Sequence, residues 1–276
     1  MIKALKRSHP IVIFIYFIGM LLLAAFSKHP WMTMTQTISL LVLDLYHYRS
    51  IKKILPYFIL IVIVAVTNPL FVQRGRTILY MNSYFRITKE ALLYGLHYGC
   101  VLVNLLFVFS IFNQYIKKEQ WIYLSGRMFP KLGVITAMAF ALIPRYQRQA
   151  KKIMNVRKTL KNENVISRTM HTVSMETTWA FESSMDQLDS MNARGYGIGK
   201  RTQFHLFTWE RKDMIHVIEI AILLCLNLWA YKKFYSRFFF YPMILMNPFE
   251  VKDMVWMIFM ALQFLIPFLW RENFYV

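Results

Sequence analysis

Two acid–histidine pairs are the residues of this chain whose types and spacing could do chemistry. Asp44 stands three residues before His47, and His216 stands three residues before Glu219. That spacing puts both members of a pair on one face of a helix, where they could relay protons or hold part of a metal site. Each pair lies only a turn or two from the expected end of an apolar segment, where an interfacial ion pair or a snorkelling side chain is the more common explanation. A membrane-embedded hydrolase or transferase that uses these pairs is kept as an alternative to the non-catalytic function that the rest of the sequence favours.

The motifs that catalysis or nucleotide binding would need do not occur in the sequence. There is no HExxH or comparable ligand cluster, no Gly-x-Ser-x-Gly elbow and no Gly-rich phosphate loop. Cys100 and Cys225 stand far apart in apolar runs, which favours buried free thiols over a disulfide or a metal pair. We therefore expect no catalytic residues, no metal site and no cofactor, and we do not expect the chain to hydrolyse ATP itself.

The most pointed polar signal is the stretch DQLDSMNARGYGIGKRT at residues 186–202. One interpretation is a simple helix stop, in which Gly195 closes the last turn and Arg194 complements the negative end of the helix dipole. The other interpretation is a contact device, because a guanidinium at a helix tip, beside a residue without a side chain, can enter an acidic groove of another protein. Arg157 stands at the end of another expected helix, which precedes this one in the chain. Two helices that each end in arginine suggest a grip on two partners, or on two sites of a dimer.

The composition places these residues on a membrane protein. The chain has 276 residues, of which 57% are hydrophobic, well above the share in a soluble domain. We expect an all-α polytopic membrane protein with about six transmembrane helices. The expected membrane segments are 11–26, 35–47, 54–72, 91–112, 213–231 and 251–270.

The net charge of +19 has to be divided between the two sides of the membrane, because Lys and Arg collect in cytoplasmic loops. Placing the N-terminus inside puts 24 of the 33 Lys and Arg residues on the cytoplasmic side. The other nine face out, and Arg74, Arg76, Arg86 and Lys89 are among them. The prediction divides the chain into transmembrane helices 1–112, a cytoplasmic segment 113–212 and C-terminal transmembrane helices 213–276. The cytoplasmic segment holds 17 basic and seven acidic residues. Its basic face is expected to bind anionic lipid, and no separable module for nucleic acid is present.

Within the cytoplasmic segment, the pattern predicts a pair of long amphipathic helices that cross. The first, at about 136–160, carries a stripe of Tyr146, Ala150, Ile153 and Arg157, and its apolar start at 132–144 is expected to dip into the bilayer. A polar connector, KNENVISRTMHTV, follows it.

The second helix of the pair is expected at about 174–194. Its apolar stripe consists of Phe181, Met185, Leu188 and Met191, and its acidic stripe consists of Glu182, Asp186 and Asp189. A basic stripe on the first helix, made of Arg145, Arg148 and Lys152, is expected to face the acidic stripe where the helices cross. Exposed pairs of this sort contribute little stability and serve orientation.

The residues of this cytoplasmic segment resemble those of a known family, the T components of energy-coupling factor transporters. These T components are CbiQ-like membrane proteins that belong to bacterial importers of vitamins and metal ions. The resemblance is strongest at SMDQLDSMNARGYGIGKRTQF (184–204). It also covers SHPIVIFIYF (8–17), TNPLF (67–71), YFRITKEALLYGLHYG (84–99), ALIPRYQRQAKKIMNVRK (141–158) and TWERKDMIHVIEIA (208–221).

The resemblance implies that two coupling helices cross beneath the membrane and end in Ala-Arg-Gly-like motifs, each inserted into a groove of one ATPase subunit. Carried over, the second motif is Ala193, Arg194 and Gly195, which matches in full. The first motif falls on Val156, Arg157 and Lys158, where only the arginine is kept.

The resemblance further implies two cytosolic ATP-binding cassette subunits and a small membrane S component that binds a vitamin or a transition metal ion. The expected dock for the S component consists of Met185, Leu188, Met191 and Ile153. The other interpretation of these residues is that they pack against the chain's own bundle. A permease with its own substrate path is a third hypothesis for the chain.

Overall fold

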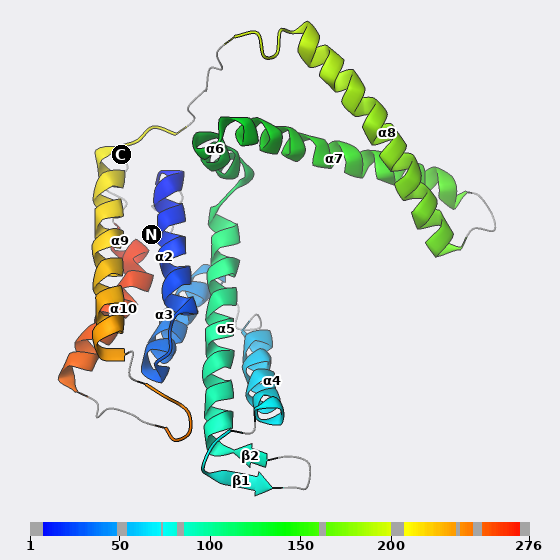
Figure 1. The fold of residues 1–276 in the computed structure, drawn as a ribbon. Coiled ribbons are helices and arrows are strands. Elements are labelled where there is room, and N and C mark those ends of the chain that lie inside the picture. Colours follow the sequence, from blue (N-terminus) through cyan, green and yellow to red (C-terminus); the bar gives the residue numbers. More distant parts are fainter. Residues whose placement is uncertain are drawn as a thin grey trace. The chain divides into compact units, whose positions relative to one another are not determined.

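The computed structural model is mostly helical and describes residues 8–48, 54–72, 74–81, 86–159, 164–199, 207–235, 238–244 and 250–270 (Figure 1). The chain divides into two compact units. The first unit is Met1–Lys117 together with Thr208–Val276, and the second is Lys118–Phe207. For comparison, the sequence places its cytoplasmic segment at 113–212.

The first unit is a bundle of apolar helices. Its elements are α2 (Pro10–Ala25), α3 (Pro30–Tyr48), α4 (Leu55–Phe71), α5 (Lys89–Tyr115), α9 (Arg211–Ala230), the π-helical turn η2 (Tyr231–Tyr235) and α10 (Val251–Leu269). Among the residues that the structure describes, three helices are long and apolar enough to span a membrane, namely Lys89–Tyr115, Arg211–Lys233 and Val251–Phe268. Pro10–Ala25 and Leu55–Phe71 are shorter apolar helices. Helices therefore lie at all the expected membrane segments, and three of them meet the length and composition of a full span.

Helix α2 is at the centre of this bundle. It packs against both α5 and α9 (Figure 1), and Ile13, Tyr16 and Met20 are almost fully buried. The hydroxyl of Tyr16 donates to the carbonyl oxygen of Phe264 in α10 at 2.6 Å. This bond satisfies a buried polar group and ties the first helix of the bundle to the last.

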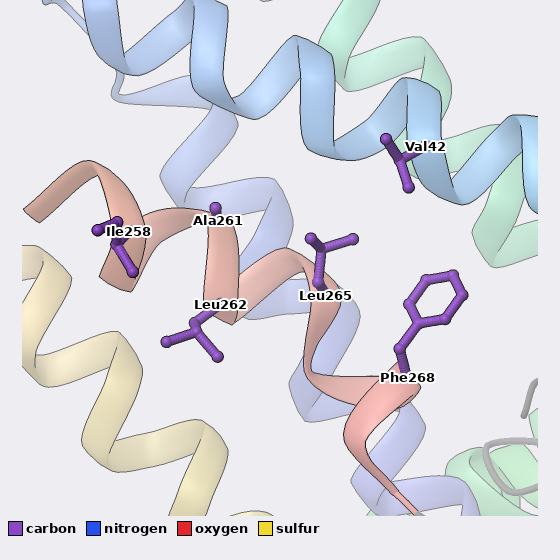
Figure 2. A pocket seen from close by; sticks show the side chains of 6 residues that line it. All are labelled: Val42, Ile258, Ala261, Leu262, Leu265 and Phe268. Carbon is purple, nitrogen blue, oxygen red and sulfur yellow. The ribbon is translucent and has the colours of Figure 1, made fainter. Parts of the chain in front are cut away.

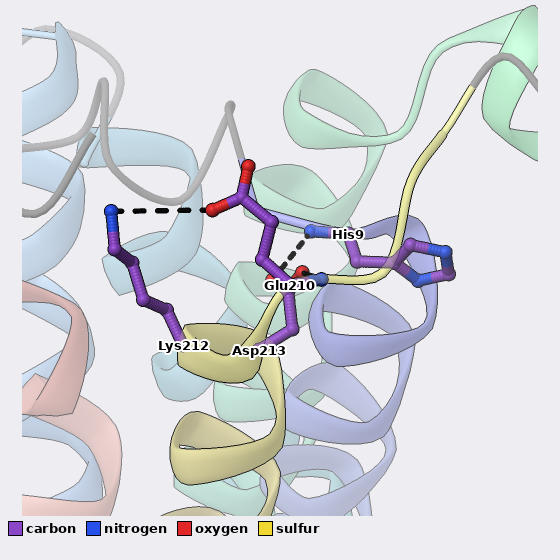
Figure 3. Close-up of polar contacts among 4 residues, drawn as sticks. All are labelled: His9, Glu210, Lys212 and Asp213. Carbon is purple, nitrogen blue, oxygen red and sulfur yellow. Dashed lines mark hydrogen bonds and ion pairs between the residues drawn. The ribbon is translucent and has the colours of Figure 1, made fainter. Parts of the chain in front are cut away.

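The N-termini of α2 and α9 are joined by one buried carboxylate (Figure 3). Asp213 accepts hydrogen bonds from the backbone N–H of His9 at 3.0 Å and from that of Glu210 at 3.1 Å. Its side chain therefore closes a capping box on α9 and also holds the start of α2. The Lys212 ammonium lies 4.0 Å from the Glu210 carboxylate, and the His9 ring meets the edge of Trp209. Because these groups lie about 200 positions apart in the chain, no local pattern pointed to the contact.

A short β-hairpin precedes α5 and is an addition to the expected all-α fold. Strand β1 (Ile78–Met81) pairs antiparallel with β2 (Arg86–Thr88). Thr88 then caps α5, since its hydroxyl accepts from the N–H of Ala91 at 3.3 Å. The hairpin therefore continues into α5 without an intervening loop.

The second unit consists of α6 (Lys118–Met128), α7 (Pro130–Lys158) and α8 (Val165–Ala193). Helices α6 and α7 approach closely at Gly126 and Gly133, where a Cβ on Gly133 would collide with the Gly126 backbone. Ser125 and Thr136 hydrogen-bond across the same contact at 3.0 Å. Two glycines thus permit the two helices to pack backbone against backbone.

Residues 132–144 form the start of the first long helix, as expected, and α7 runs continuously from Pro130 through Pro144 to Lys158. One expectation about this unit is corrected by the structure. The polar connector expected at 161–173 is wrong from Val165 onward, since α8 starts there instead of at about 174. The Thr and Ser residues that made this stretch look like a loop donate back along the helix. Thr169 bonds the carbonyl of Val165, for example, at 3.1 Å.

Candidate functional site

The end of α8 is a Schellman motif built on Gly195. This glycine has φ = 77°, and its N–H donates to the carbonyl of Asn192 at 2.9 Å. The N–H of Tyr196 donates to the carbonyl of Met191 at 3.0 Å, which completes the motif. The helix-stop interpretation of the Arg-Gly signal is therefore confirmed, and only a residue that tolerates positive φ fits this position without strain.

The helix stop leaves Arg194 at an exposed helix tip. Arg194 is the C-cap residue, and no ion pair joins it to another residue that the structure describes. Ala193 beside it is exposed as well. The following turn adds two apolar side chains, because Tyr196 is 44% exposed and Ile198 is 87% exposed. Sequence reasoning missed these two residues, although they follow the arginine directly within the motif.

The end of α7 is differently surrounded. Arg157 is half-buried, and its Nη1 lies 3.5 Å from the Sδ of Met175 on α8. Val156 is 68% exposed and Lys158 is also exposed. Thr159 closes the helix, since its hydroxyl donates to the carbonyl of Val156 at 2.6 Å. Val156 and Lys158 therefore flank the arginine as an accessible surface.

The structure does not bring the two arginines together. Arg157 lies against Met175, and Arg194 stands 19 positions further along α8, which corresponds to roughly 28 Å at a rise of about 1.5 Å per residue. The two tips are thus separate contact points on the pair of helices α7 and α8.

Helices α7 and α8 cross (Figure 1), and aromatic side chains make contact between them. The Trp179 ring meets the edge of Tyr146 with ring centroids 5.7 Å apart. The guanidinium of Arg145 lies over the same indole at 5.3 Å from its centroid. Each contact is worth about 0.5–1.5 kcal/mol. The indole of Trp179 therefore stabilises the crossing through contacts with both the Tyr146 ring and the Arg145 guanidinium.

The charged stripes lie largely away from this crossing. Glu182, Asp186 and Asp189 on α8 are exposed, and so are Arg148 and Lys152 on α7. Arg145 contacts an indole ring, whereas the sequence had predicted an acidic neighbour. The contacts recorded at the crossing are thus aromatic and cation–π in character.

Helix α8 exposes its apolar face and buries its more polar face, which is the reverse of the arrangement in a helix that packs on a soluble core. One face of the helix is buried or half-buried, and it consists of the indole of Trp179 and the polar residues Thr172, Glu176 and Ser183. The residues on the other face are apolar and exposed. They are Ile166 (73%), Met170 (70%), Val173 (66%), Phe181 (70%), Met185 (65%) and Leu188 (50%), and we call them the apolar stripe of α8. An exposed apolar stripe of this length marks an interaction surface.

The expected dock for the S component falls partly on this stripe. Met185 and Leu188 belong to it, and Met191 is half-buried next to the helix end. Ile153 is half-buried on the face of α7 that also carries Tyr146 and Arg157, both of which contact α8. The first half of the stripe was missed because its residues lie in the stretch that the sequence assigned to a connector.

The acid–histidine pairs lie in the first unit. His216 Nδ1 is 3.4 Å from Glu219 Oε2, and the Trp270 indole N–H donates to the same oxygen at 3.2 Å. The Trp270 ring also stacks on His216 with centroids 4.0 Å apart. This cluster ties α9 to the end of α10. Asp44 is buried in α3, while the side chain of His47 lies outside the described residues.

The described residues of the first unit line an apolar groove and an aromatic cavity. A groove of about 400 Å³ between α3 and α10 is lined only by apolar side chains, namely Val42, Ile258, Ala261, Leu262, Leu265 and Phe268 (Figure 2). Without a polar group it offers nothing for catalysis. A second cavity, of about 340 Å³, is lined mainly by aromatic side chains, among them Tyr94, Tyr98, Phe240 and Tyr241.

His29 stands near this second cavity, in the turn between α2 and α3. Its ring meets the edge of Phe238, with centroids 5.0 Å apart. Burial lowers the pKa of His29 to about 4, and the negative charge of Asp253 opposes this shift only partly. His29 is therefore neutral at physiological pH.

No group of three His, Cys, Asp or Glu side chains within the described part of the chain is arranged to hold a metal ion. Comparison with known proteins adds no family, because no family model and no curated protein matches the chain.

Proposed function

We propose that this chain is the transmembrane coupling subunit, or T component, of an ATP-driven importer of the energy-coupling factor type. The observation that carries the proposal is α8, which turns its apolar stripe outward and ends in an exposed Arg194. A helix with this arrangement is suited to contact two kinds of partner, one along its length and one at its tip. The resemblance of the ARGYG stretch to the family's coupling motif agrees with this assignment.

In this proposal Arg194 and Arg157 each enter a groove of one cytosolic ATPase. Arg194 is flanked by Ala193, which has only a methyl side chain, and by Gly195, which has none, so the backbone can approach the groove wall closely. Arg157 is flanked by Val156 and Lys158, so its contact is wider and less tightly packed. The separation of roughly 28 Å along the helix pair would let each arginine reach a different ATPase subunit.

Movement of the ATPases would then be carried by α7 and α8 as a unit. ATP-driven closing of the two motors displaces the two helix tips, and the aromatic crossing at Trp179 transmits the displacement between the helices. The apolar stripe of α8 carries the S component, which reorients and releases a vitamin or metal ion to the cytosol. The bundle of about six membrane helices holds the device in the bacterial plasma membrane, with the segment 113–212 in the cytoplasm.

The proposal is tested by replacing Arg157 and Arg194 with alanine, singly and together, and quantifying the proteins that co-purify from native membranes. The matched control is Lys152→Ala, which removes an exposed cation from the same helix pair. Hydrogen bonds to a charged group contribute about 1.5–3 kcal/mol, so each arginine variant is expected to lose about 10- to 150-fold in ATPase affinity. The control should retain the ATPases.

Two results would overturn the proposal. One is a double variant that keeps the ATPases at the native level. The other is the recovery from native membranes of a chain that binds and turns over a substrate alone, with that turnover lost in Glu219→Gln. The second result would establish the membrane-enzyme hypothesis instead.

A further inference from the structure

The β-hairpin before α5 exposes apolar side chains on both of its faces. Strand β1 consists of Ile78, Leu79, Tyr80 and Met81, which are 49%, 62%, 59% and 61% exposed. Successive side chains of a strand point to opposite faces, so neither face of β1 is covered by the protein. An isolated two-stranded hairpin of this composition is poorly stable in water. An apolar medium is therefore the environment that suits it.

The hairpin stands where membrane helices end. Strand β2 runs directly into α5, which begins at Lys89 and is long and apolar enough to span a bilayer. Strand β2 also packs beside α4, and the last residue of α4, Phe71, is 86% exposed (Figure 1). With α5 spanning a bilayer, the hairpin would lie at the level of the membrane–water boundary, where aromatic and apolar side chains gather.

Four exposed cations surround this apolar strand. They are Arg74, Arg76, Arg86 and Lys89, and the stretch from Val72 to Lys89 contains no acidic residue. The nearest carboxylate, Glu90, is buried and turned inward, where it accepts from the Thr77 hydroxyl at 2.8 Å. The cations are therefore not neutralised within the hairpin.

This cluster of cations is expected on the outer side of the membrane, which is unusual for Lys and Arg. The topology expected from the sequence places the hairpin outside, where Lys and Arg are ordinarily depleted. Long basic side chains at a boundary can lay their stems along apolar surface and present their charges to lipid phosphates. Complementary charge on the headgroups gives these four cations a partner.

We propose that the hairpin is an interfacial anchor for the outward end of the bundle. Ile78, Leu79, Tyr80 and Met81 insert among the acyl chains, and the cations Arg74, Arg76, Arg86 and Lys89 bind anionic phospholipid headgroups. The proposal rests on the membrane-spanning character of α5 and is independent of any role in ATP coupling.

Insertion is tested with nitroxide labels on the full chain in nanodiscs that contain phosphatidylglycerol and phosphatidylcholine. Leu79→Cys is labelled in a Cys100→Ser, Cys225→Ser background, and collisions with oxygen and with a water-soluble nickel chelate are compared. The label is expected to favour oxygen, as lipid-facing sites do. The control label at Ile198→Cys, on an 87% exposed side chain, should favour the nickel chelate.

Two outcomes would overturn the insertion. A label at position 79 that is as accessible to nickel as the control would place the hairpin in water. A label shielded from both reagents would show that a protein surface, such as a second copy of this chain, covers it.

Headgroup binding is tested by counting the lipids that stay bound to Arg74→Gln/Arg76→Gln/Arg86→Gln in native mass spectrometry. Each neutralisation is expected to lower the preference for phosphatidylglycerol over phosphatidylcholine about five-fold, so the triple variant should lose more than about ten-fold. The control, Lys232→Gln/Lys233→Gln/Lys252→Gln, removes the same charge from other residues predicted to face out, and should stay within about two-fold. Equal losses in both triple variants would overturn the assignment of a headgroup site to the hairpin.

Discussion

Replacing Phe181 with alanine separates an interaction surface from a core surface on α8. The Phe181 side chain is 70% exposed, which leaves about 140 Å² of a phenylalanine side chain of about 200 Å² open to a partner. At about 25 cal/mol per Å², a partner that covers all of it gains up to about 3.5 kcal/mol, or roughly 300-fold in affinity. Because partners rarely cover a residue completely, we expect a loss between about 10- and 300-fold.

The same substitution should leave α8 itself intact. Alanine has a higher helix propensity than phenylalanine by about 0.5 kcal/mol, and the ring has little protein contact to lose. Hydrogen exchange of the α8 amides, measured on the full chain in nanodiscs, is expected to be unchanged or slower. Quantitative mass spectrometry of proteins that co-purify from native membranes measures the partner, which is expected to be a small membrane protein.

Trp179→Ala is the matched aromatic control on the opposite face of α8. Its loss removes the Tyr146 contact and the Arg145 contact together, so we expect about 2 kcal/mol of local destabilisation and about 30-fold faster exchange. If Phe181→Ala accelerated exchange as much as the control, the ring would be packed against this chain, and the reasoning about the apolar stripe would be refuted. Native partner recovery in Phe181→Ala would refute it equally.

Three further predictions concern individual contacts. Gly195→Ala forces a Cβ into φ = 77° and should cost about 1 kcal/mol, seen as faster exchange in the last turn of α8. Asp213→Ala removes the acceptor of the His9 and Glu210 amides, so the thermal midpoint should fall by an amount equivalent to about 2–4 kcal/mol. The pKa of His29 is lowered by burial to about 4. As the pH falls, the His29 imidazole is therefore protonated in the unfolded chain before it is protonated in the folded chain. Stability is therefore expected to fall as pH drops from about 6.5 to about 4, and His29→Gln should reduce that dependence in thermal melts.

Each of these predictions has a control or a contradicting result. Gly199 is exposed, and a Cβ there would meet no atom within 4 Å, so Gly199→Ala should be close to neutral. Asp253→Ala opens a similar capping box on α10 in which the carboxylate is less buried, so it should lose less than Asp213→Ala. Equal losses in the two aspartate variants would contradict the role of Asp213 in joining two helices. For His29, a pH profile that is identical in the native chain and in His29→Gln would contradict the assignment.

The long apolar helices of the bundle followed from composition and length alone. The helix stop at Gly195 was equally visible in sequence, because an arginine followed by glycine at the end of an amphipathic pattern has a local physical cause. The hairpin had a local signal too, since apolar and aromatic residues flank the Asn82-Ser83 pair, but the membrane-length apolar runs on both sides of it are the stronger pattern.

The errors lie where local chemistry was overridden by the helix. Thr169 and Thr172 favoured a connector in the sequence, yet their hydroxyls bond carbonyls four residues back and leave the helix unbroken. The contact of Asp213 with His9 could not be predicted, because it depends on two helix starts meeting in space.

The central claim is that the tip of α8 seats in an ATPase. A photo-activatable amino acid at position 198 tests it most directly, because Ile198 is 87% exposed and its replacement leaves Arg194 intact. Irradiation of native membranes is predicted to cross-link the chain to an ATP-binding cassette ATPase, and Arg194→Ala should reduce that product at least about ten-fold. Cross-links to lipid alone, or an ATPase product that is indifferent to Arg194, would contradict the account.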